Sequence, residues 1–318
     1  MNEQPAHDLN QVKPTSLSHL IGQSSVIEQV KVALDAAQMD GKKMDSALLV
    51  GPPGMGKTAL AHVVAQEMAT DLHEVLGQSV RNPGDLNAIL LAAKNKDVVH
   101  IDECHQLGRD FQTALYLAID QGKLVVNGNN KPQTIPIADF TLLLSTTDEY
   151  GLLQPLRDRM KLTLRFDFFS EEELATVVRL RSKGLQWEVD DMVFGMIAER
   201  ARGTPRIALR LLQACRRVCR SEGESLITVK HLMRACDLEQ VDALGLGATE
   251  QKYLEVVGNT AARLNVIASM LGLPSRTVSE VVEPFLVRSG LMIKDDQGRR
   301  QLTEKGQLHL SNLRSTDV

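Results

Sequence analysis

The sequence predicts an α/β fold: a doubly wound parallel sheet, followed by an all-helical domain and a small winged-helix domain. Three observations support this prediction. Short apolar runs alternate with helical segments up to about residue 167, which is typical of a buried parallel sheet. Helical segments alone then follow up to about residue 243. The last part has the pattern helix, helix–turn–helix, then two β-prone runs around Gly298.

The elements of the first domain follow in order. Residues 24–43 have apolar side chains at helical spacing, with Ser24 or Ser25 as N-cap candidates. The runs SALLVG, DVVHID and FTLLLSTT read as buried strands, and residues 109–120 read as a helix. Two β-prone runs flank Asn127–Asn130, whose turn-forming residues predict a hairpin.

The helical part begins with a capping box formed by Ser170 and Glu173, and its first helix ends at Gly184. Helices are predicted within residues 190–203, 204–223 and 228–237, and LEQVDALGLG reads as a linker. We therefore divide the chain into a disordered tail (1–12), a large domain (13–167), a small helical domain (168–243) and a winged helix (244–318).

The composition excludes several classes of protein. The chain has 318 residues, 43% of them hydrophobic, and a net charge of −4, so any role with nucleic acid must be local. Only 3% are aromatic, fewer than stacking platforms for single strands usually carry. We find no signal peptide and no apolar run of membrane-spanning length. The four cysteines are best read as reduced thiols of a cytoplasmic protein; a metal or redox pair at Cys215 and Cys219 is the alternative.

Residues 51–58, GPPGMGKT, match the phosphate-binding P-loop between a predicted strand and a predicted helix. Backbone N–H groups of such a loop turn toward phosphate oxygens, and the helix dipole assists. Lys57 would reach the β- and γ-phosphates, and the Thr58 hydroxyl would ligate Mg²⁺. The predicted cofactors are ATP and Mg²⁺. The loop residues that hold them are Gly51, Pro52, Pro53, Gly54, Met55, Gly56, Lys57, Thr58 and Ala59.

Two acids stand at the C-terminal end of the strand DVVHID. Asp102 would hold magnesium through water, and Glu103 would polarise the attacking water as a general base. For His105 we expect a structural role, packing or hydrogen-bonding behind Glu103; a third catalytic group is the alternative.

Further candidates follow the next strand. Thr146 and Thr147 end it, at a position between the two strands just described and near the γ-phosphate. An arginine at 157 or 159 could reach the nucleotide of a neighbouring subunit, although the spacing alone does not exclude two solvated arginines. Arg206 begins a helix of the small domain, where it could touch the γ-phosphate in cis.

In this order, the parts are those of an AAA+ ATPase, and the chain resembles the RuvB family, the motors of Holliday junction branch migration. The resemblance runs from about Lys13 to Leu310. It is carried by LIGQSSVIEQVKVALDAA, LLVGPPGMGKTALAHVVAQEM, NPGDLNAIL, IDECHQL, FTLLLSTT, PLRDR, RGTPRIALRLL and VVEPFLVRSGLM. RGTPRIA, the EPFL segment and the early IGQ are its more family-specific parts.

The resemblance implies roles around the nucleotide. Leu20 and Ile21 would flank the adenine, with Phe169 packed on it. It makes Thr147 the first sensor, Arg206 the second sensor, and Arg159 the arginine finger that acts on the neighbouring subunit.

The resemblance also implies partners. It predicts a homohexameric ring around duplex or four-way-junction DNA, with the winged helix touching the DNA backbone. Arg299 and Arg300 of the wing are the candidate contacts. A RuvA-type partner would dock on the hairpin near Asn127.

The chain departs from the family pattern at four places. Asp148 and Glu149 follow the paired threonines, where the family usually has arginine, and Phe169 replaces a tyrosine. The hairpin is shorter and lacks a glycine-rich tip. The wing carries Asp295 and Asp296, and residues 248–318 hold nine basic and eight acidic side chains, so this domain alone should bind DNA weakly.

We therefore expect an ATP-hydrolysing ring motor of RuvB type that translocates duplex DNA and drives branch migration in recombination and repair. The altered hairpin and acidic wing leave two alternatives. One is a divergent AAA+ ATPase that remodels a protein partner. The other is an ATP-dependent DNA-binding switch. Stimulation of the ATPase by DNA, or by a protein partner, would discriminate between them.

Overall fold

The computed structural model describes residues 14–127, 132–259 and 261–316. The predicted tail, residues 1–12, and Gly128–Asn130 at the hairpin tip lie outside the described residues. The chain forms two compact units. Unit 1 comprises the residues up to Val177 together with Thr204–Arg206, and unit 2 comprises Val178–Gly203 and the chain from Ile207 onward.

Unit 1 is built on a five-stranded parallel sheet with strand order β2-β3-β6-β1-β7, which confirms the predicted fold class. Its strands are β1 (Ala47–Val50), β2 (Leu72–Leu76), β3 (Val98–Asp102), β6 (Thr141–Thr146) and β7 (Leu162–Arg165). The three strands predicted from apolar runs are the central ones. The edge strands β2 and β7 are only partly buried, which explains why no continuous apolar run marks them.

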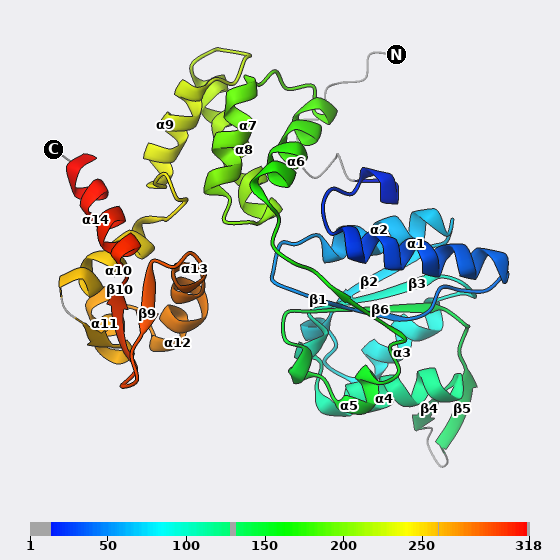
Figure 1. The fold of residues 1–318 in the computed structure, drawn as a ribbon. Helices are drawn as coiled ribbons and strands as arrows, with labels where there is room; N and C mark the ends of the chain where they lie inside the picture. Colours follow the sequence, from blue (N-terminus) through cyan, green and yellow to red (C-terminus); the bar gives the residue numbers. More distant parts are fainter. Residues whose placement is uncertain (1–13, 128–131, 260, 317–318) are drawn as a thin grey trace. The chain divides into compact units, whose positions relative to one another are not determined.

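Helices cover both faces of this sheet, with α1 and α2 on one side and α3, α4 and α5 on the other (Figure 1). Their bounds are α1 (Ser24–Met39), α2 (Lys57–Glu67), α3 (Pro83–Ala92), α4 (Arg109–Gln121) and α5 (Gln154–Arg157). Leu48, Ile101 and Leu144 of the sheet share one buried cluster with Leu90 of α3 and Leu115 of α4. The carboxyl ends of the strands therefore meet on a rigid support.

The start of α1 differs from the prediction. The N-cap is Gln23, with a φ of 55°, and neither Ser24 nor Ser25 occupies that position. The Gln23 side chain is used elsewhere: its Nε2 donates to the carbonyl oxygen of Asp167 at 2.6 Å, and its Oε1 accepts from the Asp167 N–H at 3.0 Å. This long-range pair joins the beginning of the domain to the segment after β7.

The predicted hairpin is present and follows α4. Strands β4 (Lys123–Asn127) and β5 (Pro132–Pro136) pair antiparallel in a separate two-stranded sheet. Gly122 ends α4 in the left-handed conformation, with a φ of 63°, which turns the chain into β4. The hairpin lies at the far end of α4 in Figure 1.

The small helical domain, called the lid from here on, has four helices among the described residues, all of which were predicted. They are α6 (Glu171–Gly184), α7 (Asp191–Arg200), α8 (Pro205–Ser221) and α9 (Val229–Glu239). The Ser170–Glu173 capping box is also confirmed, because the Ser170 N–H donates to Glu173 and the Glu173 N–H donates to Ser170 Oγ. All four cysteines of the chain are free and buried. Burial raises the pKa of the Cys215 thiol to about 12 and raises the pKa of Cys104, Cys219 and Cys236.

The winged helix has the predicted pattern. Its elements are α10 (Ala248–Asn259), β8 (Ala262–Arg263), α11 (Leu264–Leu271), α12 (Ser275–Thr277), the π-helical turn η6 (Val278–Val282), α13 (Glu283–Arg288), β9 (Met292–Lys294), β10 (Arg299–Leu302) and α14 (Glu304–Thr316). The strands form a sheet of order β8-β10-β9. Tyr253, Ile267, Val278 and Leu286 belong to its buried core.

The segment LEQVDALGLG is not an extended linker. Asp242 Oδ1 accepts from the N–H groups of Leu244 and Leu246, both at 2.8 Å, and Asp242 Oδ2 lies 2.8 Å from His309 Nε2 of α14. Leu246 is fully buried in the winged-helix core. The connection is a folded turn because one carboxylate satisfies its backbone.

Arg202 ties the lid to the winged helix within unit 2. Its Nε donates to the carbonyl oxygen of Gly245 at 2.7 Å, and its Nη1 donates to Glu250 Oε1 at 2.7 Å. Its guanidinium also stacks 4.8 Å from the ring centroid of Phe285. None of the helices among the described residues has the length and apolarity needed to cross a membrane.

Candidate nucleotide site

The loop between β1 and α2 has the backbone of a phosphate cradle. Gly54 and Gly56 have φ values of 82° and 96°, a region that glycine adopts without a Cβ penalty. A Cβ atom on Gly51 would lie 2.7 Å from the carbonyl oxygen of Phe166, so no larger residue fits there. Gly56 is the N-cap of α2, which places the loop at the positive end of a helix dipole. This arrangement suits an anion such as a phosphate.

The Lys57 side chain lies inside this loop. The residue is only 5% exposed, and its Nζ donates to the carbonyl oxygens of Gly51 at 2.7 Å and Pro52 at 2.9 Å. Burial lowers the pKa of the Lys57 ammonium, while the carboxylates of Glu103 and Asp102 act in the opposite direction. The predicted phosphate-binding lysine and the two predicted acids thus form one electrostatic cluster.

Asp102 and Thr58 meet at the end of β3. Thr58 Oγ1 donates to Asp102 Oδ2 at 3.1 Å, across 44 positions of sequence. The strand and the helix that carry these residues were predicted from local patterns, and the parallel sheet brings their ends together. A hydroxyl and a carboxylate side by side are hard oxygen ligands of the kind that Mg²⁺ prefers.

Glu103 adopts an unusual backbone conformation, with φ 48° and ψ 48°. Non-glycine residues rarely occupy this left-handed region, which costs of order 1–3 kcal/mol. Its N–H donates to Asp102 Oδ1 at 3.0 Å. The buried Gly77, which follows β2 and begins the turn η3 (Gly77–Ser79), faces it: a Cβ atom there would lie 2.6 Å from the Glu103 carbonyl oxygen. Gly77 therefore leaves the space that this backbone needs.

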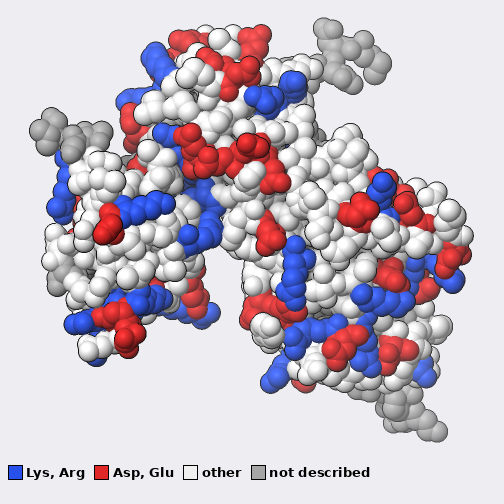
Figure 2. Space-filling view, viewed as in Figure 1, with Lys and Arg blue, Asp and Glu red and all other residues white. Residues whose placement is uncertain are grey.

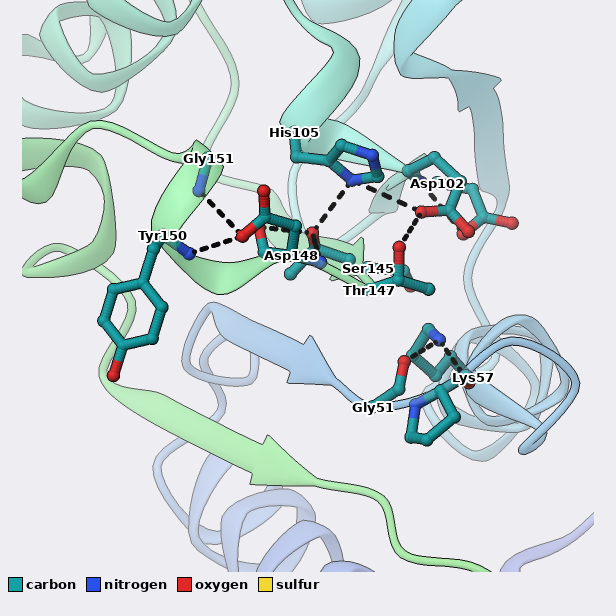
Figure 3. A network of polar contacts seen from close by, with 12 residues as sticks. Gly51, Lys57, Asp102, His105, Ser145, Thr147, Asp148, Tyr150 and Gly151 are labelled. Carbon is teal, nitrogen blue, oxygen red and sulfur yellow. Dashed lines mark hydrogen bonds and ion pairs between the residues drawn. The ribbon is translucent and has the colours of Figure 1, made fainter. Parts of the chain in front are cut away.

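The Glu103 carboxylate contacts Thr147, which directly follows β6 and is labelled in Figure 3. Its Oε2 accepts from Thr147 Oγ1 at 3.2 Å and lies 3.3 Å from His105 Nδ1. His105, in the turn η4 (Cys104–Gln106), also lies 3.0 Å from Thr146 Oγ1. The structure brings the candidate base and the candidate first sensor into contact, with His105 behind the carboxylate as expected.

The residues predicted to hold adenine come from two segments that lie together. Leu20 and Ile21 are partly buried and precede Gly22. A Cβ atom on Gly22, whose φ is 66°, would lie 2.9 Å from Phe169 Cε1. The aromatic ring predicted to stack on the base is therefore packed against the Leu20–Gly22 segment.

Arg206 belongs to the same compact unit as the P-loop. A Cβ atom on Gly54 would lie 2.9 Å from Arg206 Cβ and 3.5 Å from its Nε. The guanidinium also contributes to lowering the pKa of Lys57, after the larger effect of burial. The structure thus places the predicted second sensor over the loop.

Arg159 lies outside this cluster and is held against α4. Its Nη2 donates to Asp120 Oδ2 at 2.7 Å, its Nη1 donates to the carbonyl oxygen of Pro155 at 2.8 Å, and it stacks 4.9 Å from the Tyr116 ring centroid. The hydrogen bond that Arg159 donates to the Asp120 carboxylate raises the pKa of Arg159. Contacts of this kind orient the side chain, and its role toward a neighbouring subunit stays a prediction.

The two wing arginines differ in their surroundings. Arg300 is 8% exposed, and its Nε and Nη2 donate to Glu283 at 2.7 and 3.1 Å. These bonds favour a structural role over the predicted DNA contact. Arg299 is exposed and pairs with Asp295 at 2.8 Å. Asp295 Oδ1 also accepts from the N–H groups of Gln297 and Arg299, so this acid shapes the turn of the wing.

Two residues of the site have no motif that predicts them. Gly77 is a single glycine after a partly buried edge strand, and its contact with Glu103 joins residues 26 positions apart. Asp148 caps the turn η5 (Glu149–Gly151) by accepting from the N–H groups of Tyr150 and Gly151, each at 3.1 Å. Aspartate is a favoured N-cap residue, and this preference could have identified Asp148.

Family models match nearly all of the described chain. The Holliday junction DNA helicase RuvB P-loop domain matches residues 12–166, the RuvB AAA lid domain matches 169–242, and the RuvB C-terminal winged helix domain matches 243–311.

Curated relatives and solved structures agree with these matches. The Holliday junction branch migration complex subunit RuvB of Kosmotoga olearia is 35% identical over 96% of this chain and 92% of its own length. The protein of the same description from Thermotoga petrophila is 36% identical over 94% of this chain and 92% of its own length. The Thermotoga maritima RuvB Holliday junction branch migration motor superposes with a TM-score of 0.81 at 35% identity, covering 94% of this chain and 98% of that one.

Proposed function

Since the chain belongs to the RuvB family, we propose that it is an ATP-hydrolysing ring motor that translocates duplex DNA and drives branch migration of four-way junctions. The observation that carries this proposal is the contact of Glu103 with Thr147 beside the loop that holds Lys57. A site that only binds a nucleotide needs no general base, whereas a site that hydrolyses it does. In the cell, this activity would place the protein in the cytoplasm with the DNA.

The residues present fit a nucleoside triphosphate with Mg²⁺. The glycine backbone, the helix N-terminus and Lys57 suit the phosphates, and Thr58 and Asp102 offer adjacent oxygen atoms for the metal. Leu20, Ile21 and Phe169 form an apolar wall for the base. When bound, Mg²⁺ would neutralise charge on the phosphate oxygens.

Hydrolysis needs a base, a positioned water and stabilisation of negative charge. We assign the base to Glu103, which accepts the proton of the attacking water, and the orientation of that water to Thr147. Arg206 would stabilise the γ-phosphate in cis and carry its state to the lid. Arg159 would stabilise the transferring phosphoryl group of the neighbouring subunit, which requires an assembly such as a homohexamer.

The substrate on which the motor would act is DNA. A curated relative is described as a subunit of the Holliday junction branch migration complex, and we infer the same substrate here. Of the two predicted wing arginines, Arg299 is the better placed for a phosphate contact, since its side chain is exposed and that of Arg300 is buried. A RuvA-type partner would dock on the β4–β5 hairpin near Asn127.

The test is the steady-state ATPase rate with and without four-way-junction DNA at about 50 and 200 mM salt, because phosphate contacts weaken steeply over this range. Branch migration of a labelled junction is measured in the same samples. Stimulation that falls at the higher salt, together with strand exchange, is the expected result. An ATPase indifferent to DNA at both salts would overturn the proposal.

A second candidate function is remodelling of a protein partner. It is favoured by the wing, where Arg300 is engaged by Glu283 and Arg299 by Asp295. Basic and acidic side chains are also mixed on the face shown in Figure 2. An ATPase that responds to a protein bound at the hairpin, and not to DNA, would select this function.

A further inference from the structure

We propose that His105 is a positioning residue for the general base, and that it acts through the hydrogen on Nδ1. The proposal rests on the proposed function, in which Glu103 is the base. Within the described part of the chain, the polar partners of His105 are Glu103 and Thr146, at 3.3 and 3.0 Å from its Nδ1. It would therefore act on the reaction only through the carboxylate.

The hydrogen bonds of Thr146 decide which ring nitrogen carries the proton. Thr146 Oγ1 lies 2.9 Å from the Asp148 carbonyl oxygen and accepts from the Asp148 N–H at 2.9 Å. A carbonyl oxygen only accepts, so the single hydroxyl hydrogen of Thr146 is directed to it. Thr146 Oγ1 can then only accept from His105. The Nδ1 atom of His105 must therefore bear a hydrogen.

The contact with Glu103 leads to the same assignment. A bare Nδ1 lone pair facing a carboxylate oxygen at 3.3 Å would be repulsive, whereas an N–H at this distance is attracted to it. The hydrogen on Nδ1 thus donates to Thr146 Oγ1, and its partial positive charge faces Glu103 Oε2. Thr146 and Glu103 thus both require the tautomer of His105 that carries a hydrogen on Nδ1. The Nε2 atom takes no part in these two contacts.

The carboxylate is held on one side only. Oε2 accepts from Thr147 and faces His105, and within the described part of the chain no protein donor is recorded for Oε1. Oε1 is therefore the oxygen available to accept a proton from water. By fixing Oε2, His105 orients Oε1.

The support of His105 extends to Asp148. The main chain of Asp148 engages both the hydrogen and a lone pair of the Thr146 hydroxyl. Figure 3 shows its carboxylate capping η5 at Tyr150 and Gly151. A Cβ atom on Gly151 would lie 3.1 Å from His105 Cβ. A fixed chain of contacts thus runs from η5 through Thr146 and His105 to the base.

The test compares two amides that replace different ring nitrogens. In His105→Asn the side-chain NH₂ can occupy the place of Nδ1, and in His105→Gln it reaches the place of Nε2. We expect His105→Asn to retain kcat within about threefold and His105→Gln to lower it on the order of 10²-fold, the cost of a misplaced catalytic group. The Kd of ATP should stay unchanged in both. Thermal melting of both variants checks that they are folded.

The Glu103→Gln variant distinguishes failure of the role proposed for His105 from failure of the assignment of Glu103 as the base. In the Glu103→Gln background, the His105→Gln substitution should lower kcat no further, because the two residues act as a unit. Equal activities of His105→Asn and His105→Gln, or a reversed order, would overturn the role of Nδ1. Full activity of Glu103→Gln alone would instead overturn the assignment of the base.

Discussion

Glu103 carries a backbone strain that its surroundings keep in place. A left-handed glutamate persists only where neighbouring contacts determine it, and here the contacts are Asp102 on one side and Gly77 on the other. The conformation directs the carboxylate toward Thr147 at the end of β6. The position of the base thus depends on Gly77, in the connection that follows β2.

Gly77→Ala should therefore lower kcat with little effect on ATP binding. The added Cβ would lie 2.6 Å from the Glu103 carbonyl oxygen, a backbone atom that cannot move away without shifting the base. We expect a loss of at least about tenfold in kcat, since small misplacements of reacting groups are costly. Stopped-flow binding of a fluorescent ATP analogue and steady-state turnover separate the two effects.

Gly195→Ala is the matched control, because it lies within α7 and a Cβ there would meet nothing within 4 Å. It should leave both parameters unchanged. A Gly77→Ala protein with normal kcat would mean that Glu103 does not need its observed backbone.

Single residues also show where reading the sequence succeeds and where it does not. Lys57, Thr58 and Asp102 follow from local spacing, because one loop and one strand end determine their positions. Arg300 does not, since its partner Glu283 lies 17 positions away and only the fold reveals the pair. The chemistry of a residue in a short motif is predictable, whereas its burial against a distant element is not.

Among the elements, the wing depends on a buried ion pair. Glu283 is 1% exposed at the start of α13 and accepts from Arg300 of β10, from Lys294 of β9 and from Tyr253 of α10. One carboxylate therefore joins two strands and two helices. Such a pair adds little over an apolar replacement, but removing one partner leaves a buried charge uncompensated.

Glu283→Gln should destabilise the winged helix by about 3–5 kcal/mol, because it leaves a buried guanidinium without its counter-charge. Burial alone would raise the pKa of Glu283, but the bonds from Arg300 and Lys294 outweigh it and lower the pKa overall. A carboxylate with a depressed pKa stabilises the fold above its unfolded value of about 4.3, and this contribution is lost as the pH falls through the folded value.

Urea denaturation of the full chain between pH 3 and pH 7 measures this effect. The difference from the wild type should shrink toward the acidic end. Glu280→Gln removes an exposed carboxylate whose partner is Arg276, and it serves as the control with little expected change. Equal stability of the two variants at pH 7 would contradict the role of the buried pair.

Secondary structure was predictable where it is periodic or capped. The central strands and the Ser170–Glu173 box followed from such signals. The connection around Asp242 did not, because its order comes from hydrogen bonds to its own turn and to His309 near the C-terminus. Polar and glycine-rich composition is shared by linkers and by tight turns, so it cannot distinguish them.

At the scale of the whole molecule, most of the lid belongs to one compact unit with the winged helix. Arg202 joins them four positions before Arg206, the predicted second sensor. A change in the lid on hydrolysis would thus reach the winged helix through side chains as well as through the chain. The fold class was predictable from the order of motifs. The contacts of Arg202 with Gly245 and Glu250 were not, because they join residues more than 40 positions apart.

If Arg159 acts on the nucleotide of a neighbouring subunit, assemblies that mix two inactive variants should recover ATPase activity. Arg159→Ala and Lys57→Ala should each lose ATPase activity, by about 10³-fold for an arginine finger, while the Arg159 variant still binds ATP. Mixing the two should restore part of the rate, because some interfaces combine an intact Lys57 with an intact Arg159. ATPase activity across a series of mixing ratios measures the recovery.

Asp120→Asn distinguishes this role from a purely local one. It weakens the bond that holds Arg159 against α4 but keeps the guanidinium. If that bond were the whole function of Arg159, Asp120→Asn would be as inactive as Arg159→Ala, and mixing would restore nothing.

The buried thiols make the protein suited to fluorescence measurements. Cys104, Cys215, Cys219 and Cys236 are at most 3% exposed, and burial raises the pKa of each, so little thiolate is present at neutral pH. A maleimide dye should leave them unmodified in the native state. Two cysteines introduced on the surface, one in each unit, would then report the distance between the units through every turnover without removal of a native residue.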